Sequence, residues 1–197
     1  TGPYEVSRFA PSEFVELHVR DEYWGKPAAR DVTVRYFPDT ISSVNALQAG
    51  GVDVVWGVQN PELLDDVKEG IATEVGTTNG EVLLSMNNAR APFNDPRVRQ
   101  AVAYAVDRSA ANDILWNGMA KDTGGAPIPP TDPWFEGKHY YDYDPDKARQ
   151  LLTEAGAEGA EITLTTPTLP YAQTVAELLY SQLTEVGFKV TLDSAEF

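Results

Sequence analysis

The stretch PFNDPRVRQAVAYAVDR, residues 92–108, carries the start signal of an amphipathic helix. Asp95 stands before Pro96, and in this order a capping carboxylate precedes a proline at the first helical position. We expect the Asp95 side chain to accept the amide hydrogen of Val98. The apolar side of the helix is formed by four residues: Val98, Val102, Ala105 and Val106. The stretch therefore predicts a helix with one buried face.

Arg97 and Arg99 are unusual at this position, because the helix dipole disfavours cations in the first turn. In one interpretation they act with the free N–H groups of the helix start and grip an anionic ligand. In the other they pair with carboxylates, and the chain has 30 Asp and Glu residues. The sequence contains neither GxxxxGK[ST] nor GxGxxG, the glycine-rich patterns that cradle phosphate, so pairing is favoured.

The composition narrows the classes of function. With 197 residues, of which 42% are hydrophobic, the chain can bury the core of one large or two small domains. Its net charge of -15 would repel a polyanion, which makes nucleic acid an unfavourable partner. The sequence has no cysteine, and His18 and His139 stand in no metal-binding spacing. We therefore expect no metal site and no cofactor, and no stretch is apolar over the roughly 18–20 residues of a membrane span.

Helices and strands alternate along the chain, which indicates the α/β class. The first set is a strand, a helix and a strand at residues 31–37, 41–49 and 52–56. The second set repeats this order at residues 161–166, 171–186 and 188–192. Each set predicts a βαβ unit, so we expect two α/β modules.

Asn–Pro and Asp–Pro pairs, together with later glycines, predict two further helices, and a strand-like segment between the modules predicts a connector. One helix is expected after Asn60–Pro61 and ends at Gly70, and another is expected after Asp144–Pro145 and ends at Gly156. Residues 81–86 are strand-like and lie between the two modules. A strand in this position is expected to cross from one module to the other.

The stretch APFNDPRVRQAVAYAVDR resembles the pattern PFxDxRVRQAxxxAxDR of a known family. That family comprises the extracellular solute-binding proteins of family 5, which serve ABC importers of oligopeptides, dipeptides and nickel. Further landmarks are similar in the same order: TGPY at 1–4, EYWG at 22–25, ALQAGGVDVVWGV at 46–58, GGAPIPP at 124–130 and YDPDKARQLLTEAG at 143–156. The resemblance extends over essentially the whole chain.

The resemblance implies the type II periplasmic-binding-protein fold, whose two α/β lobes close on a ligand. The chain resembles an internal fragment of such a longer protein. Residues 1–80 would belong to the first lobe, domain I, and residues 81–88 would form the crossing strand. Residues 89–197 would form the first part of the second large lobe, domain III.

The cleft between lobes is where the family binds its ligands, so the crossing strand supplies candidate residues. One side of this strand would carry Glu81, Leu83 and Ser85, and the other would carry Val82, Leu84 and Met86. We predict that the first set faces the ligand, because Glu81 can pair with a peptide amine. Burial of both sides remains an alternative.

Trp56 and Gln59 are further candidates for the ligand site. They end a predicted strand just before a helix, where open α/β sheets bind ligands. A core position for Trp56 is the alternative. Other family-like residues are expected to be structural, as turn, caps and ion pairs: Asn87, Asn88, Asp95, Arg97, Arg99, Asp107 and Arg108.

The resemblance implies a transport function without catalysis. The expected partners are a peptide or other small solute and the transmembrane subunits of an ABC permease. The expected location is extracytoplasmic, in the periplasm or lipid-anchored at the outer face of the cell membrane. A fragment of this kind would also expose surfaces through which it can self-associate. The alternatives are a hydrolase with paired carboxylates and a ligand-sensing domain of similar fold.

Overall fold

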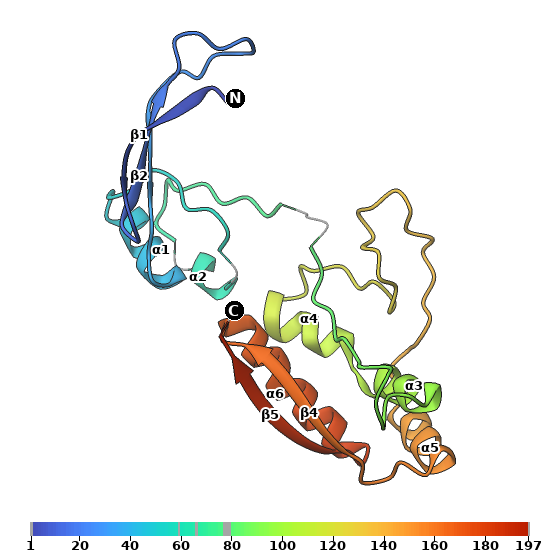
Figure 1. Cartoon of the computed structure of the whole chain (residues 1–197). Helices are drawn as coiled ribbons and strands as arrows, with labels where there is room; N and C mark the ends of the chain where they lie inside the picture. Colours follow the sequence, from blue (N-terminus) through green and yellow to red (C-terminus); the bar gives the residue numbers. More distant parts are fainter. Residues whose placement is uncertain (1, 59, 66, 77–79, 197) are drawn as a thin grey trace. The chain divides into compact units, whose positions relative to one another are not determined.

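The computed structural model describes residues 2–58, 60–65, 67–76 and 80–196. The chain divides into two compact units. Unit 1 comprises Thr1–Val58 and Asp65–Ile71, and unit 2 comprises Gln59–Leu64 and Ala72–Phe197. Each unit contains its own β-sheet, as Figure 1 shows.

Unit 1 contains a three-stranded antiparallel sheet in the order β1-β2-β3. The strands are β1 (Tyr4–Ala10), β2 (Phe14–Val19) and β3 (Val32–Arg35). The register is irregular between Val6 and Arg8, where β1 bulges against β2.

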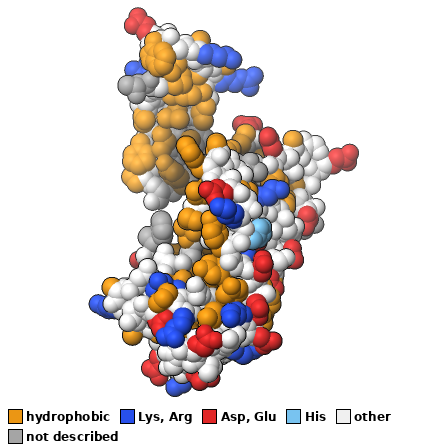
Figure 2. All heavy atoms as spheres, turned by 90° about the vertical axis from the view of Figure 1, so that its right-hand side faces the viewer, with side chains coloured by type: hydrophobic (Ala, Val, Ile, Leu, Met, Phe, Trp, Pro, Cys, Tyr) orange, Lys and Arg blue, Asp and Glu red, His pale blue; other side chains and the backbone are white. Residues whose placement is uncertain are grey.

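One face of this sheet is apolar. Cross-strand partners share a face, and the paired positions give the apolar set Tyr4, Val6, Phe9, Val15, Leu17, Val19, Val32 and Val34. Val6, Phe9 and Val34 remain 63%, 59% and 42% exposed. Figure 2 shows hydrophobic side chains gathered over the body formed by unit 1. Unit 1 therefore presents an apolar sheet face to solvent.

The βαβ unit predicted for residues 31–56 is wrong. Its helix is present as α1 (Thr40–Gln48), and the Asp39 side chain caps it by accepting the Ser42 N–H at 2.6 Å. However, β3 pairs antiparallel with β2, and residues 52–56 lie outside both sheets. A strand requires a neighbour for its backbone N–H and C=O groups, and sequence alternation does not supply one. Without that neighbour Trp56 is 95% exposed.

The helix predicted from Asn60–Pro61 to Gly70 is also too long. Among the described residues of this span, the helical part is α2 (Glu62–Asp65). The Asn60 side-chain amide donates from Nδ2 to Glu62 Oε1 at 2.9 Å. A single turn is a weak nucleus for further helix.

His18 and Asp31 close the base of the loop between β2 and β3. His18 Nδ1 lies 2.9 Å from Asp31 Oδ2, and the Val19 N–H donates to Asp31 Oδ1 at 2.9 Å. The hydrogen bond and charge of Asp31 raise the pKa of His18 above its ordinary value of 6.5. The Val19 N–H and then the His18 ring lower the pKa of Asp31 below 3.8. Both side chains are therefore charged at pH values between the lowered pKa of Asp31 and the raised pKa of His18.

Replacing Asp31 by Asn is expected to lower the pKa of His18 towards 6.5, which an NMR titration of the imidazole protons would measure. Because the folded-state pKa of His18 is raised, its stabilising contribution is present below 6.5 and lost as pH rises through the raised value. The Asp31 contribution runs the other way and is lost as pH falls through its lowered pKa. In His18→Gln the imidazole signals of His18 disappear, which distinguishes them from those of His139. An unchanged His18 titration in Asp31→Asn would contradict the pairing.

Unit 2 contains four longer helices and a two-stranded parallel sheet. The helices are α3 (Pro96–Ala105), α4 (Arg108–Trp116), α5 (Pro145–Ala155) and α6 (Pro170–Glu185). The strands are β4 (Glu161–Pro167) and β5 (Lys189–Ala195), with Glu161 opposite Lys189. The succession of β4, α6 and β5 confirms the βαβ unit predicted for residues 161–192. Figure 1 shows α6 against this pair of strands.

The core of unit 2 lies between α3, α5, α6 and the two strands. Its most enclosed side chains include Ala101 (0% exposed), Val98 (1%), Leu152 (1%) and Leu183 (2%). The predicted apolar side of α3 is confirmed for Val98, Val102 and Ala105, which are buried, while Val106 packs partly buried against the same cluster. Within the described part of the chain, every helix is too short or too polar to traverse a lipid bilayer.

Candidate functional site

A groove lies within unit 2 between the segment 81–84 and the βαβ unit. Its volume is about 200 Å³. The β4 side is formed by Leu164–Pro167, and the α6 side by Tyr171, Ala172, Val175, Ala176 and Leu179. The groove thus lies where β4 ends and α6 begins, the position at which open α/β sheets bind ligands.

The segment 81–84 is held beside unit 2 by its apolar side chains. Leu84 and Met86 pack against the core cluster of unit 2. Residues 81–88 lie outside both sheets, so the crossing strand predicted there is not paired as a strand. Side-chain burial against the core fixes this segment, and backbone pairing with β4 does not.

The groove wall is mostly aliphatic and carries a few polar groups. Thr166 Oγ1 donates to the Ala172 carbonyl at 3.1 Å, which ties the end of β4 to the first turn of α6. Thr165 Oγ1 donates to Asp193 Oδ2 at 3.5 Å. Both hydroxyls are therefore oriented by partners inside unit 2 and can still accept hydrogen bonds.

Glu81 is the carboxylate of this groove. Its Oε1 atom is buried and has no hydrogen-bond partner among the residues that the structure describes. A buried carboxylate oxygen without a donor is costly, because its hydration has been lost without replacement. This oxygen has almost no solvent-accessible surface, so it is enclosed in the wall of the groove.

The predicted division of the segment into two sides is wrong. Glu81 and Leu83 line the groove, and so do Val82 and Leu84 from the other predicted side. Ser85 is exposed and does not line it. Strict alternation holds only for a residue run in a strand, and this segment is not one.

Trp56, one of the second pair of candidates, is not among the residues that line the groove. Trp56 belongs to unit 1, whereas the groove is formed by unit 2 alone. Gln59 lies outside the described residues. The sequence argument also missed Thr165, Thr166 and Tyr171. The rule that selected Trp56, a strand end before a helix, applies equally to these residues and could have found them.

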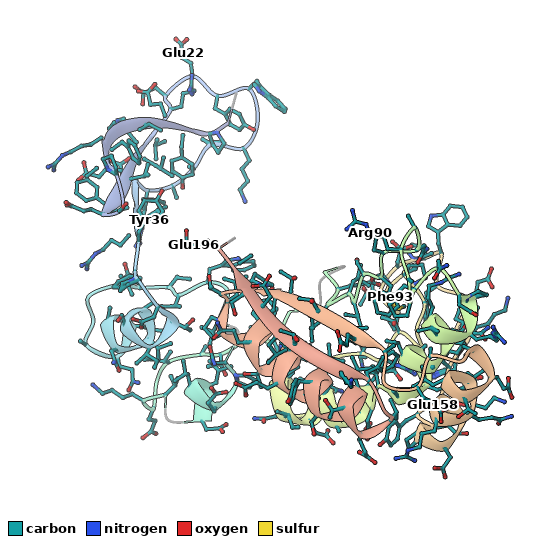
Figure 3. The ribbon with its side chains drawn as sticks, turned by 60° about the horizontal axis from the view of Figure 1, so that its bottom comes forward. Glu22, Tyr36, Arg90, Phe93, Glu158 and Glu196 are labelled. Carbon is teal, nitrogen blue, oxygen red and sulfur yellow. The ribbon has the colours of Figure 1, made fainter. Side chains whose placement is uncertain are left out.

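The arginines of the helix start contact groups inside unit 2. The Arg97 guanidinium binds Asp95 at 2.6 Å and donates to the Glu154 carbonyl at 2.6 Å, at the end of α5. Arg99 Nη1 donates to the Phe93 carbonyl at 2.7 Å, and Figure 3 labels Phe93. Neither Arg97 nor Arg99 is among the residues that line the groove.

The predicted cap of α3 is correct in its acceptor and wrong in its donor. Asp95 accepts the N–H of Arg97 at 2.8 Å, and not that of Val98. The Arg97 side chain binds the same carboxylate and draws this carboxylate towards residue 97. The Arg97 guanidinium and N–H also lower the pKa of Asp95.

Other family-like residues make turn, cap and ion-pair contacts. Asn87 Oδ1 accepts the Ala89 N–H at 3.1 Å in a turn. Asp107 caps α4 by accepting the Ala110 N–H at 3.0 Å. Arg108 anchors the long loop that follows α4.

The anchor has four hydrogen bonds. Arg108 donates from Nε to Asp122 Oδ1 and from Nη2 to the Tyr141 carbonyl, each at 2.7 Å. Asp122 Oδ1 also accepts the Gly124 N–H at 2.8 Å, and the Tyr140 N–H donates to the Gly124 carbonyl at 2.8 Å. Burial opposes the charge of Asp122, but Arg108 and the Gly124 N–H outweigh it and lower the pKa of Asp122. One arginine thus holds both ends of the loop.

Replacing Asp95 by Ala is expected to lower the melting temperature by about 2–4 °C, because the first turn of α3 loses its cap. Asp95→Asn keeps an acceptor at the cap and is the matched control, with a smaller loss. Solute affinity in a full-length protein that contains this chain should stay the same. A large loss of affinity at unchanged melting temperature would show that the helix start contributes to binding.

The described residues contain no group of three or more His, Cys, Asp or Glu side chains placed to hold a metal ion.

Comparison with known proteins gives one family. The profile described as bacterial extracellular solute-binding proteins, family 5 Middle, matches residues 1–197. The chain is 30% identical over 202 residues to the glutathione-binding protein GsiB of Escherichia coli strain K12. This match covers 100% of the chain and 39% of GsiB, so the chain spans well under half of this relative.

Solved structures show the same similarity in three dimensions. NikA of Brucella suis in complex with Fe(III)-EDTA matches with a TM-score of 0.85 and 28% identity, over 99% of this chain and 43% of NikA. The periplasmic binding protein DppA of Helicobacter pylori in complex with the peptide STSA matches with a TM-score of 0.81 and 27% identity. That match covers 100% of this chain and 39% of DppA.

Proposed function

Because the chain belongs to family 5 of the bacterial extracellular solute-binding proteins, we propose that it acts within the solute-binding component of an ABC importer. The component captures a peptide or similar small solute and delivers it to the transmembrane subunits of a permease. The observation that carries this proposal is the family match over residues 1–197. The fold is α/β and corresponds to part of the two-lobed type II periplasmic binding fold, as the similar structures show.

The groove of unit 2 is the part of the ligand site that this chain contributes. Glu81 and Leu83 line it and would contact the solute, together with Thr165 at the end of β4. A role for Ser85, Trp56 and Gln59 stays a prediction, and so does the division into lobes at 1–80, 81–88 and 89–197. Asn87, Asp95, Arg97, Arg99, Asp107 and Arg108 would be structural, which their contacts within unit 2 support.

The proposed location rests on the description of the family. The family is extracellular by its description, and the site of action would be the periplasm or the outer face of the membrane, with or without a lipid anchor. The apolar sheet face of unit 1 is the surface through which the isolated chain would self-associate, because Val6 and Phe9 are exposed there.

Binding without catalysis fits the groove better than hydrolysis. Glu81 is the one carboxylate among the described residues that line it. Hydrolysis by paired carboxylates needs a second acidic side chain across the scissile bond. The names of the similar proteins also describe binding proteins.

The proposal is tested on a full-length protein that contains residues 1–197, titrated with dipeptide, tetrapeptide, glutathione and nickel while its thermal unfolding is recorded. A bound solute stabilises the folded state by about 2.7 kcal/mol at one hundred times its Kd. We expect one class of solute to raise the melting temperature in a saturable way and to be recovered intact. Release of a cleaved product would contradict the transport function.

A further inference from the structure

We propose that His18 and Asp31 form a pH-dependent latch, which holds the loop between β2 and β3 at mildly acidic pH and loosens it as the pH rises. The loop spans residues 20–31 and carries Trp24, whose side chain is 88% exposed. The latch belongs to unit 1 and works whichever solute is bound, so it goes beyond the proposed function.

The loop is held at its base. The Arg20 N–H donates to the Pro3 carbonyl at 2.9 Å, which fixes the start of the loop. The Asp31 carboxylate fixes the end through its two contacts with β2. Residues 21–30 make no hydrogen bond with the rest of the chain that the structure describes. The position of the loop therefore depends on the few contacts at its two ends.

The charge of His18 decides how strong one of these contacts is. A protonated imidazole donates from both nitrogens and is positive, whereas the neutral ring has one donor and no charge. A charge-assisted hydrogen bond is roughly twice as strong as a neutral one. The Val19 N–H lowers the pKa of Asp31, so Asp31 stays charged when His18 loses its proton. Loss of that proton therefore weakens the contact from one side alone.

The groups around His18 keep it protonated to a higher pH than a free histidine. Three carboxylates act on its charge: Asp31 before β3, Asp21 in the loop and Glu5 opposite it on β1. Together, with Asp31 contributing most, they raise the pKa of His18. Glu16, two residues earlier on β2, is paired with Arg8 at 3.6 Å. The latch is therefore complete below the ordinary pKa of histidine and is lost as the pH rises through the raised pKa of His18.

A second loop of the chain has a different anchor. It spans residues 122–142 and also carries an exposed tryptophan, Trp134, but Arg108 holds its base. Arginine does not lose its proton in proteins, so this anchor is the same at every pH of interest. His139 lies 3.9 Å from the nearest carboxylate oxygens, which is too far for a hydrogen bond. The second loop is therefore an internal control for the first.

NMR hydrogen exchange on a full-length protein that contains this chain tests the latch from about pH 5 to about pH 9, around the range in which histidine titrates. Rates are corrected for the intrinsic effect of pH on amide exchange. We expect the Val19 N–H to exchange about two- to fivefold faster at the upper end, as for loss of an exposed ion pair. The Trp24 indole signal should shift with the midpoint of the His18 imidazole. The Tyr36 N–H, which is bonded at the other end of the sheet, should keep its rate.

Two substitutions of His18 separate its charge from its titration. His18→Gln keeps a donor without the charge, so the Val19 N–H should exchange fast at every pH. His18→Lys stays charged over this range, so the same N–H should exchange slowly at every pH. The His18 side chain is 54% exposed, so both variants are expected to fold. His139→Gln is the matched control and should keep the pH dependence at Val19.

A corrected rate at Val19 that is the same across the pH range would overturn the proposal, and so would a pH effect that persists in His18→Gln. A parallel change at Gly124, whose N–H is bonded in the base of the second loop, would indicate general loosening and would also overturn it. These outcomes do not bear on solute binding. The proposed function fails only by the solute titration described above.

Discussion

Replacing Leu152 by Ala is expected to lower the free energy of unfolding of unit 2 by about 2–5 kcal/mol, the range for deleting a buried leucine side chain. Leu152 is 1% exposed and lies in the cluster where α5 meets α3 and α6. Its loss removes apolar contacts and leaves a cavity that the helices cannot fully close. Denaturant unfolding followed by far-ultraviolet circular dichroism measures the change through the transition midpoint at constant slope.

Ile114→Ala is the control for Leu152→Ala. Ile114 also lies on a helix, α4, but is 58% exposed. Its replacement should change stability by no more than about 0.5 kcal/mol, as for other surface positions. Equal losses in the two variants would mean that the core is not where the structure places it.

Replacing Arg108 by Gln is expected to lower stability by about 1.5–3 kcal/mol, the range for hydrogen bonds that involve a charged group. The change removes the bonds to Asp122 and to the Tyr141 carbonyl, so both ends of the loop lose their anchor. Amide hydrogen exchange should then speed up at Gly124 and Tyr140, whose N–H groups are bonded inside the anchored base.

Two controls separate the anchor from charge alone. Arg108→Lys keeps the charge but lacks the planar fork that reaches two acceptors, so it should recover only part of the loss. Arg149→Gln removes an arginine whose partners Asp146 and Glu185 are largely exposed, and it should cost at most about 1 kcal/mol. Exchange at Gly124 and Tyr140 that stays slow in Arg108→Gln would rule out the anchor.

The sequence predicted the elements whose partners are close in the chain. The helix that Asp144 and Pro145 begin, α5, ends before Gly156, which is in the left-handed conformation. The βαβ unit of β4, α6 and β5 was also predicted correctly, because one helix connects two strands that pair with each other. In these cases the caps and the apolar period are local signals, and tertiary packing agrees with them.

Elements whose partners are remote were not predictable in this way. Residues 52–56 alternate like a strand, yet the structure gives them no neighbour, and Trp56 is left exposed. The apolar period cannot state which strand will pair with which. The pairing of β3 with β2 depends on the bend of the intervening loop, which the His18–Asp31 contact closes.

Part of the groove lining was among the residues that the sequence singled out. Glu81 and Leu83, which were predicted to face the ligand, line the groove, and their contact with a solute stays a prediction. The alternation that excluded Val82 and Leu84 does not hold. The groove also depends on how α6 packs against β4, a contact between residues that the sequence pattern treats separately. The buried state of Glu81 Oε1 is a property of that packing, and it has no signature in the sequence.

The contacts of Arg97 have a consequence for how family members are compared. The Arg97 side chain links Asp95, the N-cap residue of α3, to the Glu154 carbonyl in the last turn of α5. The joint depends on the distance between two helix ends and not on the cargo. The stretch at residues 92–108 can therefore stay the same in family members that bind chemically different solutes, and it serves as a marker of family membership. Differences in the solute that is bound are expected to appear in the residues of the groove wall.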